Sequence, residues 1–115
     1  MSLNYRGRTY FITSQIPEGK VLTYQSLALL ASVPSPRLVG LYLHQNPDPN
    51  LPCYRVVNSQ GKIAHTYAFG GGKAQAEKLN SDGVIFNGKR LDLKKYLWQP
   101  SPSQLKNLQN RLNQI

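Results

Sequence analysis

Residues 23–45 read Thr-Tyr-Gln-Ser-Leu-Ala-Leu-Leu-Ala-Ser-Val-Pro-Ser-Pro-Arg-Leu-Val-Gly-Leu-Tyr-Leu-His-Gln and contain the start signals of two short helices. The first threonine stands at an N-cap position ahead of a strong helix former, residues 24–31. Ser35-Pro36 is typical of the N-cap and N1 positions of a second helix, which we expect to end at residue 44 or 45. Two short helices joined by a tight turn predict a helix-turn-helix, in which the second helix enters a DNA groove.

The segments on either side predict a small domain built mostly from helices. Residues 5–16 can form a helix that ends before Pro17. Val56-Val57 and Lys62-Ile63-Ala64 flank residues 58–61, a connection with turn chemistry, and predict a hairpin that would supply a wing. The expected fold class is therefore mostly α with a small β wing: a winged helix-turn-helix DNA-binding domain.

The C-terminal half predicts a further helix and a further hairpin. We expect a helix over residues 73–80, stopped by Asp82-Gly83. Val84-Ile85-Phe86 and residues 91–93 flank Asn87-Gly88, which is a strong hairpin turn. These elements are expected to complete the same core.

A chain of 115 residues is long enough for one domain with a single core. Residues 95–98 are expected to close that core, so the winged-helix domain is placed at residues 1–100. Residues 101–115 form a polar tail rich in Asn and Gln, in which leucines at helical spacing predict a marginal helix.

The formal net charge is +9, from 14 Lys and Arg against 5 Asp and Glu. This imbalance indicates a polyanionic partner, most economically nucleic acid, and a basic surface without a partner is the alternative. A single cysteine excludes an internal disulfide and fits a reducing compartment. No apolar run approaches the roughly 20 residues that span a bilayer. We therefore expect a cytoplasmic, monomeric protein that binds no membrane.

The only cysteine, Cys53, lies in the run Leu51-Pro52-Cys53-Tyr54-Arg55-Val56-Val57. The proline makes the chain rigid on one side of the thiol, and Arg55 follows on the other. A nearby cation lowers the pKa of a thiol from its usual value of about 8.5 and would make Cys53 reactive. The alternative is an inert buried cysteine that packs as a small apolar side chain.

Five separate segments match one known family in order and spacing. They are residues 16–24, Arg37-Leu38-Val39-Gly40, Asn46-Pro47, residues 52–61 and Gly83-Val84. Over about residues 5–98 the chain resembles the C-terminal DNA-binding domain of O6-alkylguanine-DNA alkyltransferases, also called methylated-DNA–protein-cysteine methyltransferases. It also resembles the single-domain alkyltransferase-like proteins, and its ending, residues 96–100, looks like that group.

The resemblance implies that Cys53 is the alkyl acceptor, within a motif that departs from the family pattern. The full alkyltransferases have Pro-Cys-His-Arg, and alkyltransferase-like proteins typically replace the cysteine. This chain keeps Cys53 and has Tyr54 in place of the histidine. Asp82 falls where the activating glutamate is expected. Since a tyrosine with a pKa of about 10 is a poor general base, these three catalytic candidates form a weakened relay, in which Arg55 could still lower the pKa of the thiol.

The resemblance also implies a set of DNA-binding residues. Arg37 matches the arginine that pushes the damaged nucleotide out of the duplex, and Tyr24 matches the tyrosine that aids rotation of the base. Asn46 matches the hinge between the recognition helix and the cysteine loop, and Arg55 is expected to contribute to DNA binding. The plainer interpretations are a core aromatic for Tyr24 and a phosphate contact for Arg37.

A lesion at the O6 atom of guanine is inaccessible within a stacked duplex, so the nucleotide must be flipped out at a cost of a few kcal/mol. The flipped base is expected in a pocket lined by Tyr67, Phe69, Gly70 and Gly71. The plainer interpretation of Phe69 is a core aromatic.

Two functions remain open on these residues. One is a suicide alkyltransferase that moves the alkyl group to Cys53 once per molecule, and we lean slightly toward it. The other is a non-enzymatic sensor that marks alkylated guanine for the proteins of another repair pathway. An ordinary winged-helix regulator is a weaker third, because nothing in a regulator requires Pro-Cys-x-Arg-Val. We expect no cofactor and no metal, since Cys53, His44 and His65 lack paired, close-spaced ligands.

Overall fold

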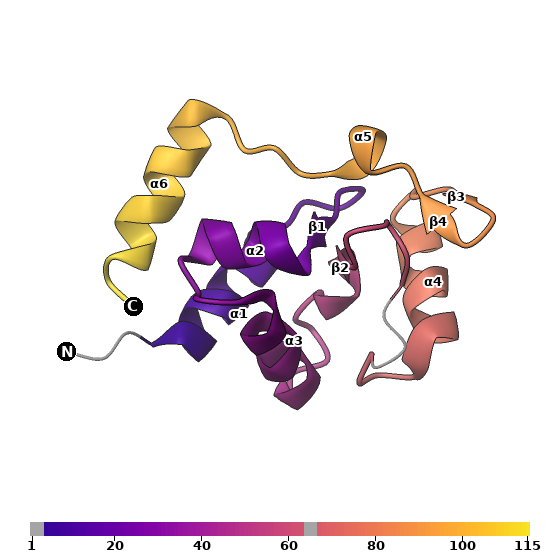
Figure 1. Ribbon diagram of the computed structural model, residues 1–115, viewed down its shortest axis with the longest axis horizontal. Coiled ribbons are helices and arrows are strands. Elements are labelled where there is room, and N and C mark those ends of the chain that lie inside the picture. The colour runs from indigo at the N-terminus through magenta and orange to yellow at the C-terminus, as the bar shows by residue number, and fades with distance from the viewer. Residues whose placement is uncertain (1–3, 64–66) are drawn as a thin grey trace.

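A computed structural model describes residues 4–63 and 67–115 of the chain. In chain order its elements are α1 (Tyr5–Gln15), β1 (Leu22–Thr23), α2 (Tyr24–Ala31), α3 (Pro36–Gln45), the 3-10 turn η1 (Cys53–Arg55), β2 (Val56–Val57), α4 (Gly71–Ser81), β3 (Phe86–Asn87), β4 (Arg90–Leu91), α5 (Leu93–Tyr96) and α6 (Pro102–Leu112). Figure 1 shows α1, α2 and α3 gathered together, with α4 and the β3–β4 hairpin at one end of the molecule and α6 at the other.

The helix-turn-helix forms where the sequence predicts it. The Thr23 side chain accepts a hydrogen bond from the Ser26 amide and begins α2, and Ser35 does the same for α3 through the Leu38 amide. Ser32 ends α2 in the left-handed conformation, at φ 54°. The two helices are bent by 96° relative to each other, which is within the usual range of the motif.

The prediction of a hairpin directly after the cysteine is wrong. β2 pairs instead with β1, in parallel, with Leu22 opposite Val56 and Thr23 opposite Val57. Both valines of β2 are completely buried, and a two-stranded wing exposed to solvent cannot bury both faces of a strand. The turn at residues 58–61 does form, since the Asn58 amide donates to the Lys62 carbonyl at 3.0 Å. The expected second strand is Lys62-Ile63-Ala64, and its last residue lies outside the described residues.

The second predicted hairpin is confirmed and is the wing-like element of the fold. Phe86 of β3 lies opposite Leu91 of β4, and Asn87 lies opposite Arg90. The two-residue loop is therefore Gly88 and the lysine after it, one position later than expected. Gly88 supplies the positive φ, 65°, that this tight turn requires.

The core consists of two apolar clusters on the two sides of the β1–β2 pair. The larger cluster joins α1, α2 and α3 and includes Ile12, Leu27, Val39 and Val56. The smaller one places Val57 against α4 and the hairpin. Adjacent residues of β2 thus belong to different clusters, as expected for a strand whose side chains alternate between faces.

The helix expected in the polar tail forms as α6 and packs against α1. Leu108 and Leu112 belong to the larger core cluster. Arg8 of α1 is almost fully buried and donates to the Leu112 carbonyl at 2.8 Å and to the Ala31 carbonyl at 2.7 Å. One guanidinium therefore supplies hydrogen bonds at the C-terminal ends of both α2 and α6.

No single helix in residues 4–63 and 67–115 is long and apolar enough to cross a membrane, and α2 and α3 reach that length and composition only as a bent pair.

Candidate base pocket and nucleic-acid interface

Cys53 begins a single 3-10 turn that connects the loop after α3 to the buried strand β2. Its amide donates to the Leu51 carbonyl at 2.7 Å, and the Arg55 amide donates to the Pro52 carbonyl at 3.0 Å. Because Pro52 has a restricted φ and Val56 is anchored in the core, the turn is held at both ends. The Cys53 side chain, 7% exposed, is thereby held in a fixed position at the edge of a pocket.

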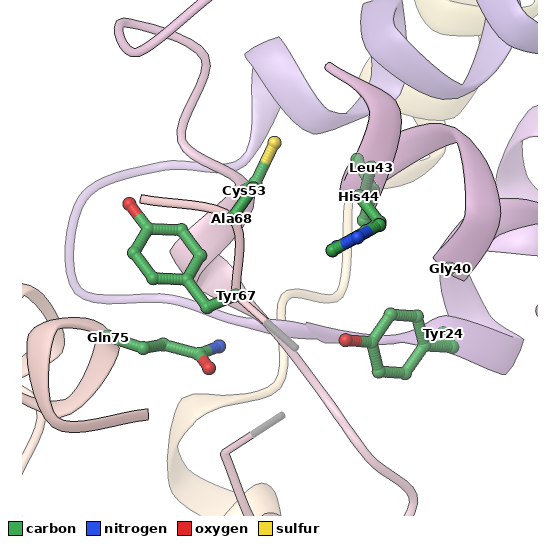
Figure 2. Close-up of a pocket in the computed structure, with 8 residues that line it drawn as sticks. All are labelled: Tyr24, Gly40, Leu43, His44, Cys53, Tyr67, Ala68 and Gln75. Carbon is green, nitrogen blue, oxygen red and sulfur yellow. The ribbon is translucent and has the colours of Figure 1, made fainter. Parts of the chain in front are cut away.

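The pocket lies between the helix-turn-helix and α4. Its lining residues come from α2, α3, the cysteine turn, the following loop and α4, and they are Tyr24, Gly40, Leu43, His44, Cys53, Tyr67, Ala68 and Gln75. In Figure 2 the Tyr24 hydroxyl and the Gln75 amide point toward each other across the pocket. The cavity volume is about 20 Å³, which is room for about one water molecule.

The Cys53 thiol is held by Asn46, at the C-terminal end of α3. The Asn46 side-chain amide is 3.5 Å from Sγ and donates to the Asp48 carbonyl at 2.8 Å. Burial raises the pKa of the thiol from its ordinary value of 9.0 to about 11, although the Asn46 hydrogen bond lowers it. The thiol is therefore protonated at neutral pH, and the expected lowering of its pKa by Arg55 is not found.

Tyr54, Arg55 and Asp82 form a separate cluster next to the thiol. Arg55 Nε is 2.7 Å from one Asp82 oxygen and Nη2 is 3.3 Å from the other, an ion pair whose side chains are 15% and 6% exposed. The Tyr54 hydroxyl donates to Asp82 at 3.2 Å, and burial raises the pKa of that phenol. Asp82 is thus engaged with Arg55 and Tyr54, so the three catalytic candidates do not form a chain of hydrogen bonds that ends at Sγ.

Arg37 and Tyr24 lie where α3 and α2 border the pocket. Arg37 is exposed in the first turn of α3, three residues before the pocket residue Gly40, and therefore lies on the same side of the helix. Tyr24 lines the pocket, and burial raises the pKa of its phenol. A Cβ at Gly40 would be 3.8 Å from the Tyr24 ring, an ordinary contact, so close approach by another chain segment does not explain this glycine.

Of the expected aromatic and glycine residues, Tyr67 lines the pocket and the other three lie next to it in the chain. Phe69 packs edge-on against Tyr67, with the ring centroids 6.0 Å apart. Gly70 and Gly71 have φ values of 116° and 75° and form the connection into α4. Phe69, Gly70 and Gly71 are not among the residues that line the cavity. His65, named above as a candidate ligand, lies outside the described residues.

Sequence reasoning missed several pocket residues. Leu43 and His44 follow Gly40 by about one turn of α3, so the helical period could have placed them on the same face. Gln75 has no such signal: it is fully buried in α4 and donates to the carbonyls of Tyr54 at 3.1 Å and Val56 at 2.9 Å. A buried glutamine that holds another segment is visible only once the chain is folded.

A helix-turn-helix followed by a rigid Pro-Cys turn, with a pocket between them, defines a small class of domains. Residues 4–84 match the family model described as 6-O-methylguanine DNA methyltransferase, DNA binding domain. The chain belongs to this family.

Two relatives illustrate the range of the family. The alkyltransferase-like protein 1 of Schizosaccharomyces pombe is 34% identical in an alignment of 100 positions that covers 81% of this chain and 93% of that protein. The bifunctional methyltransferase/endonuclease of Picrophilus torridus is 36% identical in an alignment of 118 positions that covers 99% of this chain. The chain spans only 39% of the length of that larger protein.

The fold comparison agrees with the sequence comparison. The structure of S. pombe Atl1 in complex with damaged DNA containing O6-carboxymethylguanine has a TM-score of 0.74 and 30% identity, and it covers 87% of this chain and 100% of that one.

Proposed function

We propose that this protein binds duplex DNA, rotates an O6-alkylated guanine out of the stack and recognises it in the pocket beside Cys53. The observation that carries the proposal is the position of the pocket, which opens between α3 and the cysteine turn and is bordered by Tyr24 and Gly40. Arg37 is exposed one turn away on α3. The recognition helix and the pocket can therefore engage the same nucleotide.

The charge and the relatives support the same function. A net charge of +9 favours a phosphate backbone as partner. Flipping a base costs a few kcal/mol, and a side chain that fills the vacated stack, here Arg37, offsets part of that cost. Among the relatives are proteins named DNA base-flipping protein, such as that of Vibrio parahaemolyticus, which is 38% identical over 97 residues.

Recognition without rapid transfer is the form of this function that the geometry supports best. Attack on the alkyl carbon requires a thiolate, but burial raises the pKa of Cys53 to about 11. Asp82 is paired with Arg55, and Tyr54 is a phenol whose pKa is raised. We therefore expect a damage sensor that, once bound to the lesion, is recognised by other repair proteins. The single free cysteine also favours a reducing, cytoplasmic location.

Slow alkyl transfer is a second candidate, favoured by one observation: Cys53 is retained and is among the residues that line the pocket. In that reaction the carbon of the alkyl group would form a bond to Sγ as its bond to O6 breaks. Guanine would leave with the electron pair and take up a proton, and the thiol would lose its own. Tyr54→His would supply a base with an ordinary pKa of about 6.5 and should make this reaction faster.

One experiment tests both candidates on the same sample. The protein is incubated with a duplex that contains O6-methylguanine, the bound fraction is measured, and intact protein is then analysed by mass spectrometry. We expect a bound protein of unchanged mass. A gain of one methylene unit on the Cys53 peptide would establish transfer, and a bound fraction equal to that of the undamaged duplex would refute recognition.

A further inference from the structure

Lys78 of α4 contacts three aromatic rings behind the pocket wall. Its Nζ donates to the Tyr67 hydroxyl at 2.6 Å and lies 5.0 Å from the centroid of that ring. The same ammonium is 5.8 Å from the ring of Tyr54 and 5.9 Å from that of Phe69. Each distance is within the range of a cation–π interaction. One half-buried cation thus connects α4, the cysteine turn and residues 67–70, which we call the aromatic wall.

The pocket is open to solvent but too small for a base in this state. Its volume of about 20 Å³ holds about one water molecule and cannot admit a purine. On the opposite side the cavity is bordered by α2 and α3, whose Leu43 is part of the core cluster. The aromatic wall, in contrast, lies outside regular secondary structure until α4 begins. A base can therefore enter most easily if this wall moves.

The connection between the wall and α4 can act as a hinge. Gly70 and Gly71 both have positive φ values, and a Cβ on Gly71 would meet no atom within 4 Å. A pair of glycines can change backbone conformation at low steric cost. In this structure the Gly71 amide donates to the Tyr67 carbonyl at 3.0 Å, and movement of the wall away from α4 would break this bond.

We propose that Lys78 is a positioning residue that latches the aromatic wall over the pocket, so that its contacts with Tyr67 and Phe69 must be broken before a flipped base can enter. The DNA part of this inference rests on the proposed function, whereas the latch itself is a property of the protein without DNA. By this mechanism Lys78 limits entry to nucleotides that leave the stack for long enough to find the wall open.

The first test measures access to the single thiol in the protein without DNA. Cys53 lines this narrow pocket and is buried, so a neutral disulfide reagent such as 4,4′-dithiodipyridine should react at a rate that follows the opening of the wall. We expect Lys78→Met to react about tenfold faster, and Lys78→Arg, which keeps the cation, to react at nearly the parent rate. Lys73→Met removes an exposed charge from the same helix and serves as the matched control.

The direction in which Lys78→Met changes the labelling rate of Cys53 distinguishes a latch from an electrostatic effect of the lysine charge on the thiol. Lys78 lowers the pKa of the Cys53 thiol, so the loss of its charge alone would reduce the thiolate population and slow the labelling. A rate for Lys78→Met that is unchanged or lower than that of the parent would overturn the latch.

Amide hydrogen exchange separates local opening from loss of stability. In Lys78→Met the Gly71 amide should exchange faster, whereas the Val21 amide, which donates to the Tyr96 carbonyl in the core, should not. Equal acceleration of both amides would mean that Lys78 stabilises the whole fold and would contradict the proposal.

Binding to DNA then tests the functional part. Lys78→Met should associate faster than the parent with a duplex that contains O6-methylguanine, and at the parent rate with the undamaged duplex. Faster labelling with no preference for damage in either protein would leave the latch standing and refute the proposed function. Normal damage recognition with unchanged labelling would refute the latch alone.

Discussion

Alkyl transfer requires a reactive Cys53, whereas recognition of the lesion does not. The environment of this side chain can be tested without DNA. The thiol is buried, accepts a hydrogen bond from Asn46 and has a pKa raised from 9.0 to about 11. In the unfolded chain the same thiol ionises near its ordinary value. The folded state therefore favours the neutral form.

This difference predicts a loss of stability at high pH. The pKa of the thiol is higher in the folded than in the unfolded chain, so the neutral thiol makes its full contribution to the free energy of unfolding below pH 9. This contribution falls by on the order of 1–2 kcal/mol as the pH rises toward 11. Urea unfolding of the parent and of Cys53→Ala across this range measures it. The two stability curves should diverge above pH 9, and parallel curves would show that the thiol pKa is not raised.

Replacement of Arg37 is expected to have a large effect on DNA binding and a small effect on folding. Its side chain is exposed in the first turn of α3 and contributes little to the core. Arg37→Ala should weaken binding to alkylated duplex by about tenfold or more, while thermal unfolding stays within a few degrees of the parent. A collapse of the melting temperature with binding retained in the folded fraction would make Arg37 structural.

Individual elements show which parts of the fold the sequence predicts. The N-caps Thr23 and Ser35 locate α2 and α3 because a cap is a local interaction within four residues. The pairing of Val56-Val57 could not be read in this way, because their partner strand lies more than thirty residues earlier in the chain. The wall residue Tyr67 was predicted from the aromatic and glycine-rich stretch that contains it, whereas Gln75 and Lys78 act through contacts that exist only after folding.

The buried arginine of α1 gives a prediction at this scale. Arg8 donates to the carbonyls of Ala31 and Leu112, and Arg8→Met would remove both of these buried hydrogen bonds, although the Leu112 carbonyl would still accept from the Ile115 amide. We expect a loss of about 2–4 kcal/mol of unfolding free energy, measured by urea denaturation. Arg6→Met, an exposed arginine on the same helix, is the control and should change stability little. Equal losses in the two variants would contradict this role of Arg8.

At the scale of the whole molecule, the proposed function requires that charge sets the affinity for DNA and that the pocket sets the selectivity for damage. If about four phosphates are neutralised, affinity for duplex DNA should fall about a hundredfold between roughly 50 and 200 mM salt. Damaged and undamaged duplexes present the same phosphates, so their affinities should fall in parallel. Fluorescence anisotropy over a salt series measures both slopes, and a flat dependence would exclude the electrostatic contribution of the +9 charge.

The most direct test of the central claim is the ratio of two equilibrium affinities, for one duplex that contains O6-methylguanine and for the same duplex with guanine, at one salt concentration. Base recognition in the pocket predicts that the damaged duplex binds at least about tenfold more tightly, a difference of about 1.4 kcal/mol. A ratio of one would show that the protein binds DNA only through its charge and would contradict the account.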